Sequence, residues 1–511
     1  MRAARPLPDR LPAVLAAVLL GVFASARVTA QQADATPPRL ERTGLERTVI
    51  SLPDLGSGAN ALISRNEEQQ VGRMILRDLR DQRQVLEDPE STEYIHELGL
   101  RLAAQAQEGE QQFTFFVVRD RGVNAFAVPG GVIGINAGLV LETANESELA
   151  GVMAHEIGHV VQRHIARAIE AQSRNSLPMM AAMLGAILVG VAAGGDAAPG
   201  MIAMAQGAAM QQQINFTRME EHEADRVGIG YLSAAGFDPD GMAGFFSTMG
   251  RLQGPLANDI PYMLKTHPVS ALRVAEARAR AAQLPPVENR PDSPGYGMIR
   301  ERLRVLMAPE EQDLRPYYEA QLQQPGAAEL PLRYGFALAA MRAGDAATAA
   351  TALEALVDAY PETTLLHSAL GEALLADRRP EQALARFAKA VELFPRNVPL
   401  SVRYADALLA AGQASRAHEL LLDLFNNAPP TPEQIRLTAR VADAAGDRGD
   451  AYYYMAEYHI SGGDLMIATQ QLDLALAQDR LTSVQRKRYL ARREEIRGVL
   501  REERMRRYQG G

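Results

Sequence analysis

The chain has 511 residues, a formal net charge of −9 and no cysteine. At roughly 100–200 residues per domain that length predicts two or three domains, and 47% hydrophobic residues exclude a disordered chain. The acidic balance argues against a nucleic-acid-binding protein and against general attraction to anionic membranes, while the lack of cysteine excludes a disulfide-supported fold.

The N-terminus has the pattern of an export signal. Three arginines precede an apolar run, Leu11 to Ala24, which is shorter than the roughly 20 residues of a membrane span. Small residues at positions 28–30 offer a cleavage site. We predict a signal peptide over residues 1–30, cleaved near Ala30, with an N-terminal membrane anchor as the alternative. Residues 31–60 are expected to form a flexible arm.

Residues 61–284 are expected to form one domain that begins with helix and continues into a small β-sheet. Apolar residues recur at three- and four-residue steps over Ile63 to Gln107, which predicts helix. Phe113 to Val118 and Asn124 to Asn136 are rich in β-branched and aromatic residues, so we predict two short strands. The second strand is expected to bend at Pro129-Gly130-Gly131.

A helix predicted from Glu146 to about Glu170 contains the motif His155-Glu156-Ile157-Gly158-His159. His155 and His159 lie one turn apart on the same face, where both imidazoles can bind one zinc ion. Glu156 lies about 100° around the helix and can take a proton from a water molecule whose pKa zinc lowers to about 7. Apolar neighbours indicate a buried helix, which favours a metal site over a solvated face.

A catalytic zinc ion needs a third protein ligand. Gln162 and Ile165 stand where metzincins carry a glycine and a histidine, so that arrangement is excluded. His164 is five residues beyond His159, about 140° around a continuous helix, and is interpreted as structural.

The acidic cluster Glu220 to Asp225 lies on a second predicted helix, Phe216 to Ala235, and supplies several candidate ligands. Glu221 and Asp225 are four residues apart and share a face. A glutamate that binds the metal and an aspartate one turn later can act together, since the aspartate can accept the free N–H of a zinc-bound histidine.

These motifs, with Thr266-His267-Pro268, resemble the zinc metallopeptidase family that includes the HtpX membrane protease and the CAAX prenyl protease. The similarity is greatest to its periplasmic members that carry tetratricopeptide repeats, and it covers about residues 60–480. The resemblance implies that His155, His159 and Glu221 are the zinc ligands and that Glu156 is the general base. It also implies that Asp225 is a carboxylate that contacts one of the ligands.

The resemblance also implies that His267 can approach the metal and hold the enzyme latent. The alternative is a loop histidine that caps a helix before Pro268. Arg273 is expected either to neutralise the oxyanion or to pair with Asp225. The residues that match the family's substrate-side strand are Asn124, Ala125, Phe126 and Ala127. Such an edge strand can pair with an extended peptide, whereas the alternative is an ordinary internal strand.

Leu177 to Met210 is rich in Met, Ala and Gly and carries a single charge, Asp196. Neither apolar half reaches the roughly 20 residues of a spanning helix. Three interpretations stay open: a buried helical hairpin, a mobile lid over the site, or a patch that touches a membrane.

The last third of the chain is periodic. Pro361, Pro395 and Pro429 recur every 34 residues, and Gly344, Gly412 and Gly446 keep the same period with Arg378 in the missing position. This period is typical of tetratricopeptide repeats, which we predict over residues 329–480. Residues 285–328 are expected to form a linker and connecting helix, and residues 481–511 a charged C-terminal helix. The phase changes after Gly446, so the later boundaries stay open.

The expected fold is mainly α: a zincin-like helical metallopeptidase domain with a small β-sheet, followed by an α-helical tetratricopeptide-repeat solenoid. By resemblance, the chain is a periplasmic endopeptidase with one zinc ion per chain that degrades misassembled outer-membrane proteins and has a chaperone-like role. The repeats would bind substrates or the outer-membrane assembly machinery. We expect no nucleic-acid partner and at most peripheral membrane contact. The alternatives are a client-binding scaffold with a mostly latent zinc site, and an integral membrane protease with residues 177–210 inserted.

Overall fold

The computed structural model describes residues 64–106, 111–170, 217–252, 262–285, 292–326 and 328–509. The predicted signal peptide and arm, and the Met-rich segment from Leu177 to Met210, lie outside the described residues. Among the described helices, none combines the length and the apolar character that crossing a bilayer requires.

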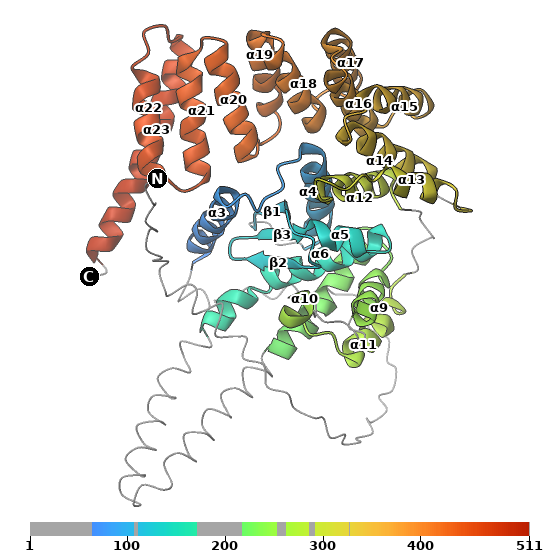
Figure 1. The fold of residues 1–511 in the computed structure, drawn as a ribbon. Coiled ribbons are helices and arrows are strands. Elements are labelled where there is room, and N and C mark those ends of the chain that lie inside the picture. Colours follow the sequence, from blue (N-terminus) through green and yellow to red (C-terminus); the bar gives the residue numbers. More distant parts are fainter. Residues whose placement is uncertain are drawn as a thin grey trace, which may run out of the picture. The chain divides into compact units, whose positions relative to one another are not determined.

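The N-terminal part of the peptidase domain consists of two helices and a three-stranded sheet (Figure 1). The elements are α3 (Arg65–Asp81), α4 (Pro89–Ala103), β1 (Thr114–Val118), β2 (Ala125–Val128) and β3 (Val132–Asn136). The strand order is β1-β3-β2, with β1 parallel and β2 antiparallel to β3. Gly134 of β3 lies opposite both Phe116 and Phe126, whose rings pack edge to face, so the sheet stays closely packed there.

The second predicted strand is in fact two strands, and this part of the prediction is wrong. β2 ends at Val128 and β3 begins at Val132. Between them Gly130 and Gly131 have φ values of 82° and 80°, which reverse the chain instead of bending one strand. The turn leaves β2 at the edge of the sheet.

The helix that carries the His-Glu motif is shorter than predicted. α6 (Glu146–Val161) is capped by Asn145, whose Oδ1 accepts from the Glu148 amide at 2.9 Å. It ends at Val161 instead of Glu170, because Arg163 has a φ of 52° and cannot continue a right-handed helix. A separate helix then runs over residues 164–170.

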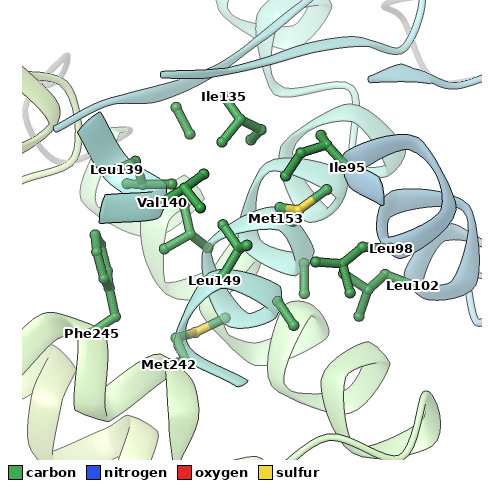
Figure 2. Close-up of a cluster of buried hydrophobic side chains, with 14 of the residues drawn as sticks. Ile95, Leu98, Leu102, Ile135, Leu139, Val140, Leu149, Met153, Met242 and Phe245 are labelled. Atoms are coloured by element: carbon green, nitrogen blue, oxygen red, sulfur yellow. The ribbon is translucent and has the colours of Figure 1, made fainter. Parts of the chain in front are cut away.

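The remaining peptidase helices enclose α6. They are α5 (Ala137–Glu142), the helix over residues 217–234, α9 (Gly241–Leu252), α10 (Tyr262–Thr266), α11 (Ala271–Ala281) and α12 (Pro294–Met307). Figure 2 shows Leu149 and Met153 of α6 between side chains of α4, α5 and α9, and all of these residues are at most 5% exposed. Close packing on several faces holds the motif in a rigid frame.

Small residues allow α6 to approach the helix over residues 217–234. A β-carbon on Gly158 would lie 3.1 Å from the carbonyl oxygen of Ala224, and one on Gly228 would lie 3.0 Å from that of Ala154. The two backbones are therefore nearly in contact on either side of the motif, and side chains from both helices can reach one point.

The C-terminal part is a solenoid of paired helices. It comprises α13 (Arg315–Leu322), α14 (Glu329–Arg342), α15 (Ala346–Ala359), α16 (Thr364–Ala376), α17 (Pro380–Leu393), α18 (Val398–Ala410), α19 (Ala414–Phe425), α20 (Pro432–Ala444), α21 (Arg448–Ser461), α22 (Leu465–Leu476) and α23 (Ser483–Gln509). Gly344, Gly412 and Gly446 join the helices within each pair with positive φ, and Arg378 takes the same conformation at 59°. Gly463 joins α21 to α22 with the same positive φ. Only one helix, α21, separates Gly463 from Gly446, whereas two helices separate the earlier positions, and this explains why the period of the sequence changes after Gly446.

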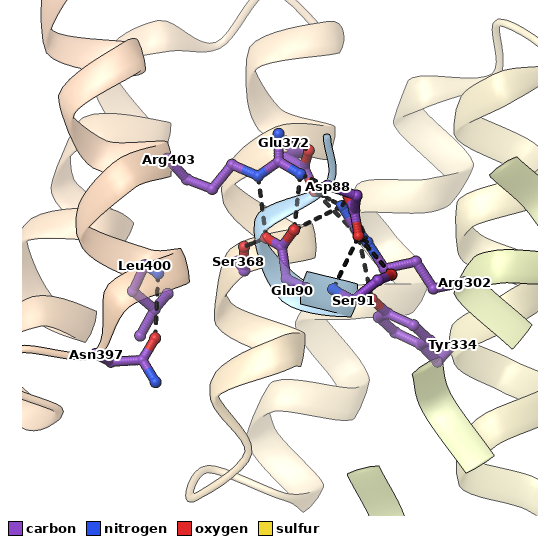
Figure 3. A network of polar contacts seen from close by, with 10 residues as sticks. All are labelled: Asp88, Glu90, Ser91, Arg302, Tyr334, Ser368, Glu372, Asn397, Leu400 and Arg403. Atoms are coloured by element: carbon purple, nitrogen blue, oxygen red, sulfur yellow. Dashed lines mark hydrogen bonds and ion pairs between the residues drawn. The ribbon is translucent and has the colours of Figure 1, made fainter. Parts of the chain in front are cut away.

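A buried network of charges joins α4 to α12 and to the repeat helices (Figure 3). Asp88 caps α4 and pairs with Arg302 of α12 at 2.7 Å. Glu90, on the first turn of α4, pairs with Arg403 of α18 at 2.7 Å. Glu372 of α16 lies 3.1 Å from Arg403. Three carboxylates and two guanidinium groups thus fix the start of α4, which packs on α6, against the solenoid.

Candidate metal centre

Side chains from three segments converge at the C-terminal half of α6. His155 and His159 come from α6, Glu221 from the helix over residues 217–234, and His267 from the loop after α10. One ligand atom from each lies within 4.8 Å of all the others. The structure therefore brings together the three predicted ligands and the predicted regulatory histidine.

The spacing of these atoms fits a small tetrahedral ion. His155 Nε2 lies 3.0 Å from His159 Nε2 and 3.3 Å from His267 Nδ1. Glu221 Oε1 lies 3.4 Å from His159 Nε2 and 2.9 Å from His267 Nδ1. Donor atoms at 2.0–2.1 Å from a tetrahedral zinc ion are about 3.3 Å apart. The donor set of imidazoles and one carboxylate therefore fits such an ion.

Glu156 is buried beside the centre and is 1% exposed. Its Oε1 atom has no hydrogen-bond partner among the described residues, and lies 3.6 Å from His267 Nε2. A buried carboxylate oxygen without a partner is unfavourable unless a ligand or water satisfies it. The position of Glu156 thus suits a group that acts on a molecule bound at the centre.

Asp225 and Arg273 contact the predicted ligands His155 and Glu221. Asp225 Oδ1 lies 2.9 Å from His155 Nδ1, and Arg273 donates to both Asp225 oxygens at 2.7 Å. A third guanidinium nitrogen of Arg273 is 2.9 Å from Glu221 Oε2. Of the two roles considered for Arg273, the structure shows the pairing with Asp225. Its guanidinium is 3% exposed and is engaged on both carboxylates.

The charges around the centre oppose the effect of burial. Burial lowers the pKa of His155, but hydrogen bonds to Asp225 and Glu221 outweigh it and raise that pKa to about 10. Burial raises the pKa of Glu221, but the charge of His267 and hydrogen bonds from His155 and His159 hold it well below its usual range. The metal-free site therefore keeps Glu221 ionised, which is the form that binds a cation.

Comparison with known proteins identifies the family. The sequence model of peptidase family M48 matches residues 89–281, which hold the whole centre, and a tetratricopeptide-repeat model matches residues 374–441. The chain is 33% identical over 454 residues to the beta-barrel assembly-enhancing protease of Escherichia coli K12, covering 88% of this chain and 91% of the relative. For the protein of that name from Yersinia pestis the identity is 33% over 470 residues, covering 92% and 96%.

The chain belongs to peptidase family M48. A more distant relative is the mitochondrial metalloendopeptidase OMA1 of Arabidopsis thaliana, 32% identical over 152 residues, or 30% of this chain and 28% of the relative. Family membership makes the chain a metalloendopeptidase, an enzyme class that uses a divalent metal ion. The predicted fold, a helical metallopeptidase domain with a small sheet followed by tetratricopeptide repeats, is confirmed, and the scaffold alternative is not favoured.

The direction predicted for the His164 side chain is wrong, because the prediction placed it on a continuous helix that points it away from the centre; its interpretation as a residue outside the ligand set stays a prediction. In this M48 peptidase the helix breaks at Gln162 and Arg163, and His164 returns toward the centre. Its Nδ1 atom lies 2.8 Å from Nδ1 of His159. No local sequence signal marks the break, because arginine rarely adopts positive φ.

The predicted substrate strand lies beside the centre. Within the described chain, β2 pairs with β3 along one side only. Asn124 precedes β2 and its carbonyl accepts from the Asn136 amide at 3.0 Å, so it belongs to the paired side. A small cleft at the end of β2 is lined by Ala127, Pro129, Val160 and the predicted ligand His159, among others.

A second group of potential ligands, His418, Asp447 and Asp450, lies in the solenoid. Asp450 already pairs with Arg488 of α23, and the hydroxyl of Tyr489 donates to it at 2.5 Å. Asp447 accepts from Gln485 of α23 at 2.8 Å. A guanidinium that already neutralises Asp450 disfavours a cation there, so this group docks α23 on the repeats.

Proposed function

We propose that this chain is a zinc-dependent endopeptidase in which His155, His159 and Glu221 bind one zinc ion and Glu156 is the general base. The spacing of 2.9–3.5 Å among the donor atoms is the observation that carries the proposal. Two histidines and one glutamate form a common ligand set of catalytic zinc, which leaves one position for water or substrate.

When bound, the zinc ion supplies Lewis acidity, which polarises the substrate carbonyl and lowers the pKa of water to about 7. Glu156 takes the proton of the attacking water and delivers it to the leaving amine nitrogen. Asp225 Oδ1 lies 2.9 Å from His155 Nδ1, where it would accept that ring's hydrogen when the metal is bound and leave Nε2 free to bind it. Arg273 holds Asp225 and Glu221 in place through its fork of N–H groups.

The resting site is proposed to be latent. His267 Nδ1 lies 2.9 Å from Glu221 and 3.3 Å from His155, within the same set of donor atoms. A fourth protein donor fills the tetrahedral position that the attacking water needs. Displacement of the Thr266-His267-Pro268 loop would open that position. Movement of this loop would therefore control activity.

An extended segment of a protein substrate is proposed to add to the edge of β2 that no described strand pairs with. Main-chain pairing with Ala125, Phe126 and Ala127 would lead the segment along the cleft to His159 and favour unfolded or misassembled proteins of varied sequence. The relatives are named for enhancing β-barrel assembly. We infer from those names that misassembled outer-membrane proteins are the substrates, with a chaperone-like role, and that the repeats bind these clients or the assembly machinery.

The localisation proposed is the periplasm, with the signal peptide over residues 1–30 removed near Ala30. The support is the basic start and short apolar run of the sequence, together with the relatives named above. N-terminal sequencing of the protein from a periplasmic extract should begin near Gln31. A chain that keeps its first residues and stays with the membrane fraction would contradict this localisation.

Metal analysis combined with a cleavage assay tests the enzyme. We expect one zinc ion per wild-type chain and none in Glu221→Ala. Glu276→Ala, which removes a surface carboxylate paired with His222 at 2.9 Å, should keep its zinc and serves as the control. Glu156→Gln should keep zinc but fail to cleave a denatured outer-membrane protein. Zinc that persists in Glu221→Ala, or cleavage by Glu156→Gln at the wild-type rate, would overturn the proposal.

A further inference from the structure

We propose that His164 is a positioning residue for the metal ligand His159, at the centre of a relay that ends on Glu223 and Arg167. The inference rests on the proposed zinc site and assigns a role to residues outside the ligand set. It concerns the surroundings of His159, whereas Asp225 and Arg273 contact His155 and Glu221.

The relay is a continuous chain of short polar contacts. His159 Nδ1 lies 2.8 Å from His164 Nδ1, and His164 Nε2 lies 3.1 Å from Glu223 Oε2. Arg167 donates to the same Glu223 oxygen at 2.9 Å. His164 is 3% exposed, so water does not compete for either ring nitrogen.

The direction of each hydrogen bond follows from the metal ligand. His159 Nε2 faces His155 and Glu221, so it is the nitrogen that binds a metal. The ring hydrogen of His159 is then on Nδ1, and His164 Nδ1 must accept it. The hydrogen of His164 is therefore on Nε2, from which it is donated to Glu223. Each ring N–H of the two histidines has one acceptor, and the tautomers of both rings are set.

The two ligand histidines are thus held differently. His155 Nδ1 lies 2.9 Å from a carboxylate oxygen of Asp225, whereas His159 Nδ1 faces a neutral imidazole at 2.8 Å. Three buried carboxylates, Glu156, Glu221 and Asp225, already surround the centre. A fourth one placed directly on His159 would add repulsion among them, and the intervening ring moves Glu223 farther from the metal.

The break after α6 brings His164 into contact with His159. Arg163 has a φ of 52° and its guanidinium lies 3.1 Å from Glu68 of α3, so the chain turns back after Val161. Arg167 also donates to the carbonyl of Gln162 at 3.4 Å and links the break to Glu223. On a continuous helix His164 would lie about 140° away from His159 and could not act on it.

Two substitutions at His164 separate a positioning role from a packing role. The Oδ1 atom of His164→Asn lies near the position of Nδ1 and can accept from His159. His164→Leu fills similar space but offers no acceptor. We expect zinc affinity, measured by competition with a chelator, to fall about 10- to 100-fold in His164→Leu. His164→Asn should keep most of the affinity. The absorption spectrum of the cobalt-substituted protein should shift in His164→Leu and stay close to wild type in His164→Asn.

The controls keep the outcome interpretable. His222→Asn changes a histidine on the neighbouring helix that pairs with Glu276 outside the centre, and should bind zinc as the wild type does. Thermal unfolding of the metal-free variants should show His164→Leu to be no less stable than His164→Asn. Wild-type affinity in His164→Leu, or equal losses in both variants, overturns the relay. A wild-type chain without zinc instead sinks the proposed zinc site itself.

Discussion

Gly158 of α6 packs directly against the backbone of Ala224, on the helix that carries Glu221. A β-carbon at Gly158 would lie 3.1 Å from the Ala224 carbonyl oxygen and 3.2 Å from its α-carbon. These distances are shorter than ordinary van der Waals contacts, so the two helices meet only because position 158 has no side chain. Close to this contact along each helix are two of the proposed ligands, His159 on one helix and Glu221 on the other.

Gly158→Ala is expected to separate the two helices and weaken zinc binding. The added methyl group meets backbone, which cannot rotate away, and overpacking of this kind costs about 1–3 kcal/mol. Urea unfolding of the metal-free protein and zinc titration should both show the loss. At Gly230 on the second helix, a new methyl group would have no atom of the described chain within 4 Å apart from the backbone of its own helix. Gly230→Ala should therefore raise the free energy of unfolding by about 0.5–1 kcal/mol. Equal behaviour of the two variants would exclude the close contact.

Arg273→Met is expected to destabilise the protein and to weaken zinc binding. The change leaves Asp225 and Glu221 buried without their guanidinium partner, and breaking a buried pair costs about 3–5 kcal/mol. Arg273→Lys should recover only part of the loss, since one ammonium group cannot bridge both carboxylates as the fork does. Arg280→Met, at an exposed position of the same helix, is the control and should stay near wild type. Unfolding in urea with and without zinc measures both effects.

His267→Ala is expected to raise the rate of peptide cleavage. Removal of the fourth donor opens a coordination position for water, while His155, His159 and Glu221 still hold the ion. Initial rates on a denatured protein substrate, at saturating zinc, compare the variant with wild type and with His222→Asn. A rate that stays unchanged, with zinc bound, would show that His267 does not block the site.

The charge network at the start of α4 is expected to make stability depend on pH. Burial raises the pKa of Asp88, but Arg302 and Arg403 outweigh it and hold that pKa well below its usual value. An acid with a lowered folded pKa stabilises the fold above its unfolded pKa of about 3.9, and this stabilisation is lost as pH falls toward the folded pKa. Urea unfolding at pH 7 and pH 3 should show the loss. In Arg302→Met the stability at pH 7 should already be about 3–5 kcal/mol lower.

Glu372 belongs to the same network, but its ionisation is expected to affect stability in the opposite sense to that of Asp88, and Glu372→Gln tests this. Burial raises the pKa of Glu372, and this exceeds the lowering by Arg302 and Arg403. A raised folded pKa means that the ionised form is disfavoured in the fold, so stability is lost as pH rises through the folded pKa. The neutral amide should therefore leave the free energy of unfolding at pH 7 unchanged or higher. A loss as large as that of Arg302→Met would contradict the raised pKa.

Much of the centre was predictable because its signals are local. The spacing of His155 and His159 places two imidazoles on one face of any helix, and the same rule pairs Glu221 with Asp225. The repeats were equally predictable as far as Gly446, since the positive-φ positions Gly344, Arg378, Gly412 and Gly446 recur on a fixed period. The strand prediction is wrong at Gly130 and Gly131, because consecutive glycines are equally compatible with a bend and with the chain reversal that their positive φ values produce.

The sequence by itself determined the class of fold, the ligand-bearing helices and the family, because helical periodicity and short motifs are properties of neighbouring residues. Only the tertiary structure decided that α6 stops at Val161, that His164 lies against His159, and that Arg273 pairs with Asp225. The end of α6 depends on Arg163, which has a left-handed backbone conformation and pairs with Glu68, far away in the sequence. Contacts of this kind follow from how distant segments pack, and no local pattern carries them.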